Sequence, residues 1–583
     1  MKTSVTIISI IFALTVSSCN FLELDESTHY EKEDVFTIFS RTQTFLTDIY
    51  SYLPVSYGMI GGNALRSAAC DEAVFINGLS SIHGFNNGTW NAIDTLDSGW
   101  NYFRGIRAAN FFLEEVKGRT FEDTKHNLDY DLIMAQFKLY PYEARFLRAF
   151  FYFELAKRYG DIPLITAVLT EEEANNLTRT PFDQVIQFIV DECDAIAPVL
   201  PIRYTQITEA QIGRASRGMA MALKSKALLY AASPLFNPNN DKSRWEKAAR
   251  AAGDFIKGAE IPRVDANESP FEGGLAYAIP TLTNLTNSWN RNYTQNTELI
   301  LGVLRPESNT FEQQNYPIGI TGGGSTGHCP TQNLVDAYEM LATGLPVSAS
   351  AGYETVDPDF DPNNPYAGRD PRLALAIATN NSIWPSQYNQ PLEVWQGGRS
   401  GKPVAFASST GYYMKKYVVG TTELRPGYTV NSSRHAWMML RYSEILLNYA
   451  EAMIEAYGDY NYKTADLPLS AIEAVNKVRA RVGVAMPPFP ATLSLEAFKL
   501  KLRNERRVEL AFEDQRFWDV RRWKILPQTM DIYGVDIERT GDNTFKYTPV
   551  LVERRVFAEK MYLYPIPQSE ININPKLTQN PGW

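Results

Sequence analysis

A glycine-rich segment at residues 322–327 (GGGSTG) fits two motifs that carry chemistry in other proteins. As G-x-S-x-G it would present Ser325 as a nucleophile, and as G-x-G-x-x-G it would hold the phosphates of a dinucleotide. A nucleophile elbow needs a strand before the serine and a helix directly after it, but Pro330 delays the next helix. No βαβ unit is visible for the second motif. We interpret the segment as a glycine run that matches both motifs by chance.

Three carboxylates, Glu505, Glu509 and Glu513, share one face of an expected helix because they are spaced four residues apart. Paired carboxylates can perform acid–base chemistry on a sugar. Arginines are interleaved with them: Arg503, Arg506, Arg507 and Arg516. This pattern favours an ion-pair lattice, which keeps the carboxylates ionised and unsuited to act as a general acid. We therefore expect no catalytic role for these glutamates.

An alternation of acidic residues resembles the opening of a calcium loop, at Asp357, Asp359, Asp361 and Asn363. The pattern lacks glycine at its sixth position and has Gly368 where a bidentate glutamate belongs. Prolines are interspersed, which favours a solvated turn. Calcium stays the alternative, and we expect no other cofactor or metal.

Aromatic residues that fall outside helical spacing could stack on sugar rings: Trp90, Trp289, Tyr293, Tyr316, Trp384, Tyr388 and Trp395. Asparagines that could hydrogen-bond sugar hydroxyls stand near two of them, at 86, 87, 290 and 292. An aromatic contact adds about 0.5–1.5 kcal/mol beyond area burial. The alternative for each ring is that it fills the core.

The N-terminus has the features of a signal peptide. A basic start precedes an apolar stretch from Val5 to Val16, which is too short to span a bilayer. The following VSSC resembles a bacterial lipobox, which predicts cleavage before Cys19 and lipidation of its thiol. The diacylglycerol on such a cysteine supplies the two chains that stable anchoring needs. An ordinary secretion signal is the alternative.

The composition excludes some partners. The net charge is −10, so nucleic acid is not expected, because phosphate binding needs a basic face. The cysteines beyond Cys19 are Cys70, Cys193 and Cys329, which are too widely spaced for a disulfide framework or a metal motif. One bridge among them stays open.

Helical spacing dominates both ends of the chain. It predicts helices at 98–116, 143–159, 181–196, 217–232 and 245–257, and again at 438–457, 469–481 and 495–512. Thr180 is the expected N-cap of the third helix. The region 262–435 is instead rich in Gly, Pro, Asn and Thr, with brief strands such as 298–304. We expect a mostly α scaffold of tetratricopeptide-like helical pairs and a large irregular lobe with short strands. Amphipathic helices that simply pack together are the alternative to repeats.

Several segments in order then resemble one family. They are WNYFRGIRAAN (100–110), EARFLRAFFYFELAKRYGDIPL (143–164), GRASRGMAMALKSKALLYAASPLFN (213–237), NLVDAYEM (333–340), RDPRL (369–373), RYSEILLNYAEA (441–452), VNKVRARVG (475–483), NERRVELAFEDQRFWDVRRW (504–523) and YPIPQSEININPKLTQNPGW (564–583). Over essentially its whole length the chain resembles the SusD/RagB family of outer-membrane nutrient-binding lipoproteins of Bacteroidota.

The resemblance implies a fold, a location and a partner. It implies a non-catalytic lipoprotein on the outer membrane that faces the cell exterior. Such a protein delivers oligosaccharides, or in some members peptides, to a SusC-like TonB-dependent transporter. With the signal peptide at 1–18, we expect helical regions at 19–260 and 436–583 and a ligand-binding lobe at 261–435.

The resemblance also implies ligand positions, which carry over incompletely. Family pocket groups follow an Asp-Glu pair, here Asp71-Glu72, and line the glycine-rich segment. His328 stands where a tryptophan would be expected, so starch specificity is not carried over. The predicted ligand-binding residues, from resemblance and aromatic pattern together, are Asp71, Phe75, Asn77, Trp90, Trp289, Tyr316 and His328. A secreted hydrolase and a helical adaptor without a small ligand are the remaining alternatives.

Overall fold

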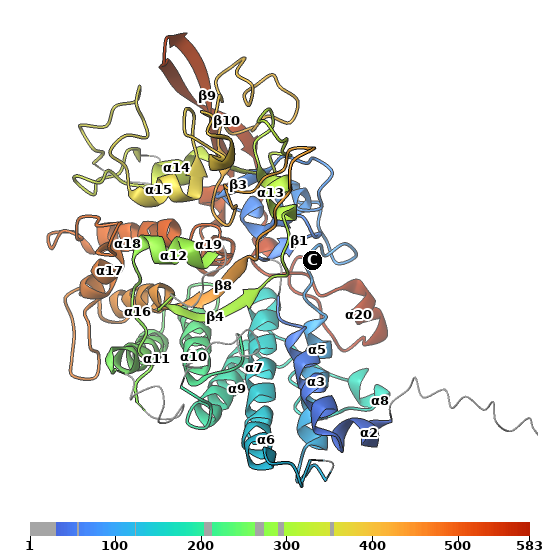
Figure 1. Ribbon diagram of the computed structural model, residues 1–583. Helices are drawn as coiled ribbons and strands as arrows, with labels where there is room; N and C mark the ends of the chain where they lie inside the picture. Colours follow the sequence, from blue (N-terminus) through green and yellow to red (C-terminus); the bar gives the residue numbers. More distant parts are fainter. Residues whose placement is uncertain are drawn as a thin grey trace, which may run out of the picture.

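The computed structural model describes residues 31–54, 57–122, 124–202, 213–262, 273–289, 296–349 and 355–583. The predicted signal peptide, Cys19 and Tyr293 lie outside these ranges. The described chain is mostly helical, with a lower layer of long helices and an upper lobe of loops, short helices and strands (Figure 1). This architecture confirms the predicted fold class. Among the described helices, none combines the length and the apolar character of a membrane span.

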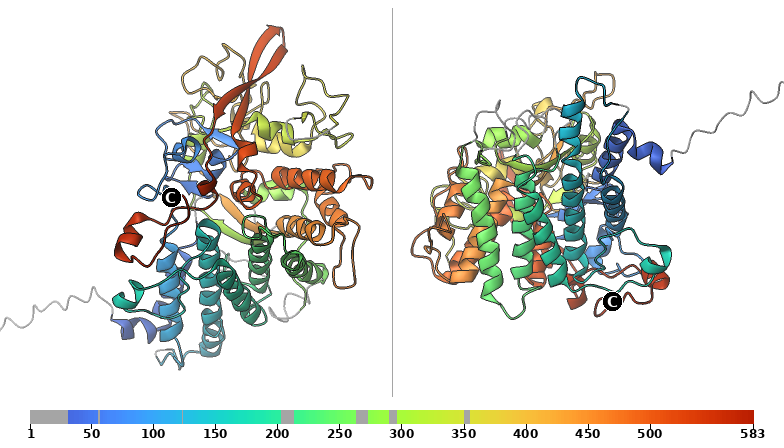
Figure 2. Two further views of the ribbon diagram at one scale, coloured as in Figure 1. Left: turned by 180° about the vertical axis from the view of Figure 1, so that it is seen from behind. Right: turned by 90° about the horizontal axis from the view of Figure 1, so that it is seen from below.

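The helical layer is built from long helices that lie side by side (Figure 2). They are α3 (Phe39–Tyr50), α5 (Tyr102–Glu115), α7 (Tyr140–Tyr159), α9 (Phe182–Ile196), α10 (Arg217–Ala232), α11 (Lys242–Glu260), α16 (Tyr442–Tyr457), α17 (Ala471–Arg479) and α18 (Leu495–Glu509). From α5 to α17 each long helix packs on the next, and α11 packs on α16 across a long sequence interval. The two helical blocks predicted at opposite ends of the chain therefore form one continuous layer.

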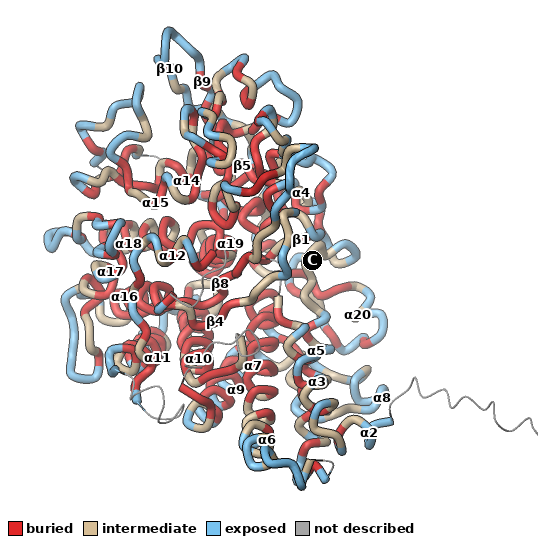
Figure 3. The backbone as a smooth tube through the Cα atoms, in the orientation of Figure 1, coloured by how far each residue is buried: buried red, intermediate tan, exposed pale blue. Residues whose placement is uncertain are grey.

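Helix α7 ends at Tyr159, as its sequence predicts, and begins three residues before the predicted start at 143. It has Pro141 in its first turn, and Gly160 directly after it adopts φ +71°. Nearly all of its side chains are buried, in keeping with its apolar character on most sides (Figure 3). The predicted N-cap of α9 is wrong. The backbone of Thr180 pairs with Ile162 in a β-bridge, and Asp161 Oδ1 accepts from the Phe182 N–H at 2.8 Å instead.

The remaining elements are short. The helices are α2 (Lys32–Phe36), η1 (Arg66–Ala69), α4 (His83–Asn87), α6 (Tyr130–Phe137), α8 (Glu171–Ala174), α12 (Leu282–Trp289), α13 (Thr310–Asn315), α14 (Gln332–Ala337), α15 (Pro371–Ala376), η5 (Ser386–Tyr388), α19 (Arg516–Arg522), η6 (Leu526–Thr529), η7 (Glu559–Tyr562) and α20 (Gln568–Ile573). The strands are β1 (Met59–Ile60), β2 (Ala64–Leu65), β3 (Ala73–Phe75), β4 (Leu299–Leu304), β5 (His328–Pro330), β6 (Ile377–Ala378), β7 (Tyr413–Met414), β8 (Ala436–Arg441), β9 (Asp531–Gly541) and β10 (Thr544–Arg554).

The described strands form antiparallel pairs: β1–β2, β3–β5, β4–β8, β6–β7 and β9–β10. Two of these pairs join distant parts of the chain, because β3 pairs with β5 and β4 with β8. The upper lobe therefore combines N-terminal residues around β3 and the C-terminal β9–β10 hairpin with the central loop region (Figure 1). The outer end of the hairpin is exposed (Figure 3).

Candidate functional site

The β3–β5 pair brings two predicted ligand-binding residues together. Phe75 lies opposite His328 in the antiparallel register, and their ring centroids are 4.8 Å apart. The Ile76 N–H donates to the Gly327 carbonyl at 2.9 Å, which joins the end of β3 to the glycine-rich segment. Asn77 follows and is exposed. Both aromatic rings are buried, so of the predicted ligand-binding residues Phe75, Asn77 and His328 only Asn77 is exposed to solvent.

His328 has both ring nitrogens occupied. Its Nε2 accepts from the Leu65 N–H at 2.8 Å, which assigns the proton to Nδ1. Nδ1 then donates to Asn315 Oδ1 at 2.7 Å. Burial lowers the pKa of His328 to about 3, so the ring is neutral at neutral pH. His328 therefore orders the base of the lobe and has no free nitrogen for a ligand.

Tyr316 lies behind the surface and supports a second ring. Its hydroxyl donates to the Val419 carbonyl at 2.7 Å and accepts from the Thr422 N–H at 3.1 Å. The Tyr388 ring packs edge-on against it at 6.3 Å between centroids. Tyr388 is partly exposed, so it is the ring through which this pair reaches solvent.

Tyr388 belongs to a group of stacked side chains, which we call the platform: Tyr388, Arg425 and Tyr428. The Arg425 guanidinium lies 5.5 Å from the Tyr388 centroid and 3.8 Å from that of Tyr428, which is 58% exposed. Arg425 also pairs with Glu423 at 2.6 Å. Hydrogen bonds from Arg425 lower the pKa of Glu423 to about 2, so this carboxylate is ionised. The sequence patterns did not reveal Arg425 or Tyr428.

The glycine-rich segment borders the platform. A Cβ on Gly322 would lie 2.4 Å from the Tyr388 hydroxyl oxygen, and one on Gly324 would lie 2.1 Å from the Tyr316 carbonyl oxygen. Thr326 donates its hydroxyl to the carbonyl of Phe406 at 2.6 Å, and the Phe406 side chain is 67% exposed. The glycines therefore permit close packing of backbone and rings beneath an exposed aromatic surface.

Ser325 does not occupy a nucleophile elbow. It is exposed, its N–H donates to the Gln313 carbonyl at 3.1 Å, and strand β5 follows it where the elbow needs a helix. This arrangement agrees with our interpretation of the glycine motif as a chance match.

Trp90 and Trp289 are enclosed by protein. Trp90 is 2% exposed and packs edge-on against Trp583 at 4.6 Å and Tyr564 at 5.1 Å. The Lys416 ammonium lies 4.9 Å from the Trp289 ring centroid, and this ring is also buried. In this structure both tryptophans fill the core. Core filling was the alternative to sugar stacking in the sequence analysis.

Asp71 lies at the bottom of a charged cavity. It forms a bidentate pair with Arg516, at 2.9 Å for each hydrogen bond, and a second pair with Arg507 at 3.0 Å. Burial alone would raise the pKa of Asp71, but these two guanidinium groups outweigh it and hold the pKa well below its usual range. The cavity has a volume of about 310 Å³. Asp71 is thus structural within the protein and borders a space of ligand size.

The carboxylates of α18 form the expected ion-pair lattice, but with other arginines. Glu505 pairs with Arg372 and Arg479, each at 2.6 Å. Glu513 lies beyond the end of α18 at Glu509, so the expected helix is too short to carry all three carboxylates. Glu509 and Glu513 pair with groups from outside α18: Arg372, Arg441, Arg481 and Lys416. Burial opposes ionisation, yet the neighbouring guanidinium groups lower the pKa of Glu505 and Glu509. The interleaved arginines that we predicted as partners instead contact Asp71, Asp519 and Trp523.

The acidic alternation at 357–363 forms local turns. Asp357 Oδ1 accepts from the Asp359 N–H at 2.8 Å, and Asp361 Oδ1 accepts from the Asn363 N–H at 2.9 Å. Within the described ranges, no three His, Cys, Asp or Glu side chains are grouped to hold a metal ion. The calcium site stays a prediction. Cys70, Cys193 and Cys329 are buried and unbridged.

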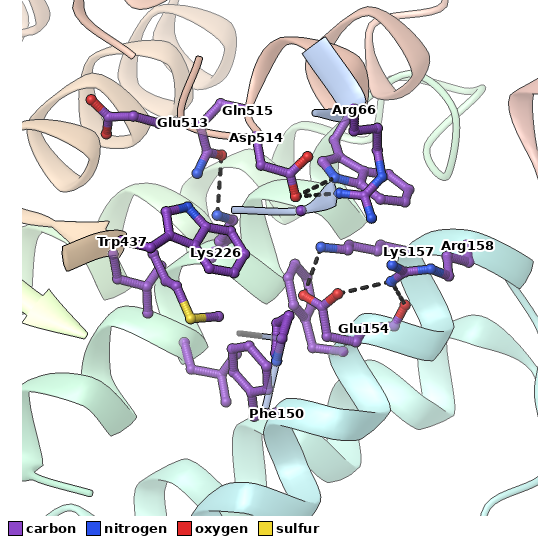
Figure 4. Close-up of a pocket in the computed structure, with 17 residues that line it drawn as sticks. Arg66, Phe150, Glu154, Lys157, Arg158, Lys226, Trp437, Glu513, Asp514 and Gln515 are labelled. Atoms are coloured by element: carbon purple, nitrogen blue, oxygen red, sulfur yellow. Dashed lines mark hydrogen bonds and ion pairs between the residues drawn. The ribbon is translucent and has the colours of Figure 1, made fainter. Parts of the chain in front are cut away.

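A small cavity lies between α7, α10 and the lobe (Figure 4). Its charged walls are paired: Lys157 donates to Glu154 at 2.6 Å, and Arg66 pairs with Asp514. Burial lowers the pKa of Lys157 to about 8. The volume of about 40 Å³ has room for a few water molecules and not for a sugar. We assign this cavity to the internal packing of the protein.

A continuous layer of paired helices that carries a loop-built lobe defines a helical scaffold protein. The chain belongs to the SusD family, whose family model matches residues 283–583. A second family model, described as starch-binding associating with outer membrane, matches residues 20–229. These matches confirm the family resemblance.

Solved structures share this fold. A SusD-like protein of Bacteroides fragilis superimposes with a TM-score of 0.73 at 27% identity, covering 95% of this chain and 99% of its own. A SusD-like carbohydrate binding protein of the same organism gives a TM-score of 0.70 at 26% identity, with 93% and 100% covered. In sequence, SusD-like protein P25 of Formosa agariphila is 22% identical over 100% of this chain and 98% of its own length.

Proposed function

We propose that this protein binds oligosaccharides without cleaving them and hands them to a partner TonB-dependent transporter in the outer membrane. The observation that carries the binding proposal is the platform, a set of exposed rings and a guanidinium beside a glycine-rich wall. A SusD-like relative of known structure is named as a carbohydrate binding protein, which supports the same class of ligand.

The platform offers both kinds of contact that a sugar needs. The flat C–H faces of a sugar ring stack on tyrosine rings, at about 0.5–1.5 kcal/mol per ring beyond area burial, by analogy with aromatic pairs. Arg425 supplies donors for hydroxyl groups, and the buried Glu423, which accepts from Arg425 and Gln387, holds the guanidinium in place. We propose that Phe406 and Asn77 extend this surface, and that Phe75, Tyr316 and His328 support it from below.

We propose that the protein does not cleave sugars because its α18 carboxylates are held in the ionised form. A glycosidase needs one carboxylic acid that can give up a proton, together with a second carboxylate. The α18 carboxylates are buried, and guanidinium groups lower the pKa of Glu505 and Glu509. Neither group suits the role of the acid.

The location is proposed from the N-terminal sequence and from the family. The lipobox-like VSSC predicts a lipid on Cys19, and the second family model is described by association with the outer membrane. We propose that the lipid holds the protein beside its transporter, with the lobe available to ligand.

The test is calorimetric titration with a panel of neutral oligosaccharides and, in parallel, with peptides. We expect saturable binding of at least one oligosaccharide, and chromatography of the incubated sugar should show no shorter products. Tyr428→Ala should weaken binding, whereas Tyr533→Ala on β9, another exposed tyrosine, should leave it unchanged. If only peptides bound, the ligand would be a peptide and not an oligosaccharide. Hydrolysis of the sugar would overturn the proposal. Co-purification with a barrel transporter tests the partnership.

A further inference from the structure

The charged cavity that contains Asp71 has features that the proposed function does not use. We call it the arginine cavity. Its lining residues belong mainly to α14, α18, α19 and η6, and α14 packs on α18. Three arginines line it: Arg503 and Arg507 from α18 and Arg516 from α19. The volume of about 310 Å³ falls at the lower end of the range for small-molecule sites.

Some guanidinium donors of these arginines have no acceptor within the described part of the chain. Arg507 is 9% exposed, and its Nη2 contacts Asp71, but no hydrogen bond of its Nη1 occurs within the described chain. Its Nε is buried and also has no hydrogen-bond partner there. Arg516 uses Nε and Nη2 on Asp71, and no acceptor for its Nη1 occurs among the described residues. A buried donor without an acceptor is costly, so the Arg507 Nε marks a guanidinium that the described chain pairs incompletely.

The third arginine adds positive charge that the described lining residues do not balance. Arg503 forms no ion pair with any described residue, and its guanidinium lies 5.1 Å from the Trp523 ring centroid. Among the described residues, the carboxylates that line the cavity are Asp71 and Asp336, so the three arginines leave an excess positive charge there. Burial also raises the pKa of Asp336, which favours its neutral form and increases that excess.

The rest of the lining suits a sugar ring better than a bare ion. Apolar atoms come from Leu500 and Ile525, and amide groups come from Gln528 and from Asn504, whose Nδ2 already donates to the Ala337 carbonyl at 2.7 Å. The Asn333 amide also lines the cavity, but it is hydrogen-bonded to Asp531 and Tyr533. Apolar patches match the C–H face of a sugar, and amides match its hydroxyls. Gln528 is exposed at the rim, whereas Asp71 and Arg516 are buried at the floor, so the cavity opens to solvent.

We propose that the arginine cavity binds the acidic group of a charged saccharide, a uronate carboxylate or a sulfate ester, with its sugar ring against Leu500 and Ile525. This proposal rests on the proposed function for the class of ligand and adds a second site with its own charge preference. Arg503 and the unused Nη1 atoms of Arg507 and Arg516 would hold the anion, since guanidinium groups bind oxyanions with fixed geometry.

The experiment titrates the intact protein with D-glucuronate, glucose 6-sulfate, neutral D-glucose and inorganic sulfate. We expect at least one acidic sugar to bind, more tightly than glucose, and to bind less tightly as salt rises. Arg503→Gln should weaken that binding about tenfold, because it removes charged hydrogen bonds without breaking the Asp71 pairs. Arg250→Gln on α11 is the matched control and should change nothing.

A second pair of variants distinguishes loss of binding from loss of folding. Gln528 is exposed, so Gln528→Glu and Gln528→Lys should both fold. The glutamate should weaken acidic-sugar binding, and the lysine should strengthen it. Absence of binding, or equal binding in all variants, overturns the proposal. Inorganic sulfate that binds as tightly as the sulfated sugar overturns the assignment to a saccharide.

The two sites can fail separately. Tyr428→Ala should leave acidic-sugar binding intact, whereas Arg503→Gln should leave neutral-oligosaccharide binding intact. Loss of platform binding with retained Arg503-dependent binding would remove only the proposed function. The opposite result would remove only the arginine cavity.

Discussion

Arg441 on β8 and Glu509 on α18 approach to 2.6 Å between Nη1 and Oε1, and each side chain is 1% exposed. Glu509 also contacts Arg481 at 2.6 Å and Arg372 at 2.8 Å. Its carboxylate therefore joins β8, the start of α15 and the segment after α17. The α18 face joins the lobe to the helical layer.

Glu509→Gln should lower the free energy of unfolding by about 3–5 kcal/mol, because it leaves buried guanidinium charge uncompensated. Urea unfolding measures the change. Glu496→Gln on the same helix is the control, since Glu496 is 84% exposed and should change stability by less than about 0.5 kcal/mol. Equal stability of the two variants would contradict this role of the lattice.

Glu72 makes stability depend on pH. Burial, its largest influence, raises the pKa of Glu72 from 4.5 to about 8, so the folded form retains a proton that the unfolded form releases. This contribution to stability is complete below pH 4.5 and is lost as the pH rises through 8. Glu72→Gln should remove it, so wild type should lose up to roughly 1.4 kcal/mol per pH unit relative to the variant between these limits. Parallel curves of unfolding free energy against pH would refute this prediction.

Gly324→Ala should destabilise the lobe by about 1–3 kcal/mol, because its Cβ would lie 2.1 Å from a backbone oxygen that cannot move cheaply. The displaced wall should also weaken oligosaccharide binding at the platform. Thermal unfolding and titration measure the two effects. Gly78→Ala, whose Cβ would meet nothing within 4 Å, should have neither effect.

Trp90→Ala should lower the free energy of unfolding by about 3–5 kcal/mol, because it removes a buried ring from between Tyr564 and Trp583. Sugar affinity of the variant, measured below its unfolding transition, should stay near that of wild type. A stable Trp90→Ala variant that no longer bound sugar would show that Trp90 contacts the ligand directly.

Cys19→Ala should release the protein from the membrane fraction, because the variant lacks the thiol that we expect to be lipidated. Cell fractionation measures the release, and titration of the soluble variant should give unchanged sugar affinity. Cys193→Ala, which alters a buried thiol, should stay in the membrane fraction. Membrane retention of the Cys19 variant would refute the anchor.

The sequence predicted the fold well, because helix formation depends mainly on residues that are close together in the sequence. The burial of α7 follows from its apolar residues, and its end follows from Gly160 directly after it. The start of α9 was misplaced, because the cap comes from Asp161 across a bridge and not from the adjacent Thr180. The partners of Glu505 could not be predicted either, since Arg372 and Arg479 reach it from other elements.

The candidate site was harder to predict, because exposure is a property of tertiary packing. Tyr316 and Trp90 are aromatic residues of the kind that stack on sugars, but both are buried. Tyr388 and Tyr428 become neighbours only through Arg425, which stacks against both rings. An arginine three residues before a tyrosine in a turn was the one local signal, and it is too common to stand out.

The Asp71–Arg516 pair links residues that are 445 positions apart. At 5–20 residues per second, the ribosome needs roughly 20 to 90 seconds between making one partner and the other. Throughout that delay the acidic side chain has no counter-charge, and β3 has no β5 to pair with until part-way through it. The Asp71–Arg516 pair therefore cannot form until residue 516 has been made, close to the end of the chain. A premature stop codon before Arg507 would leave a long but incomplete polypeptide that proteases should remove.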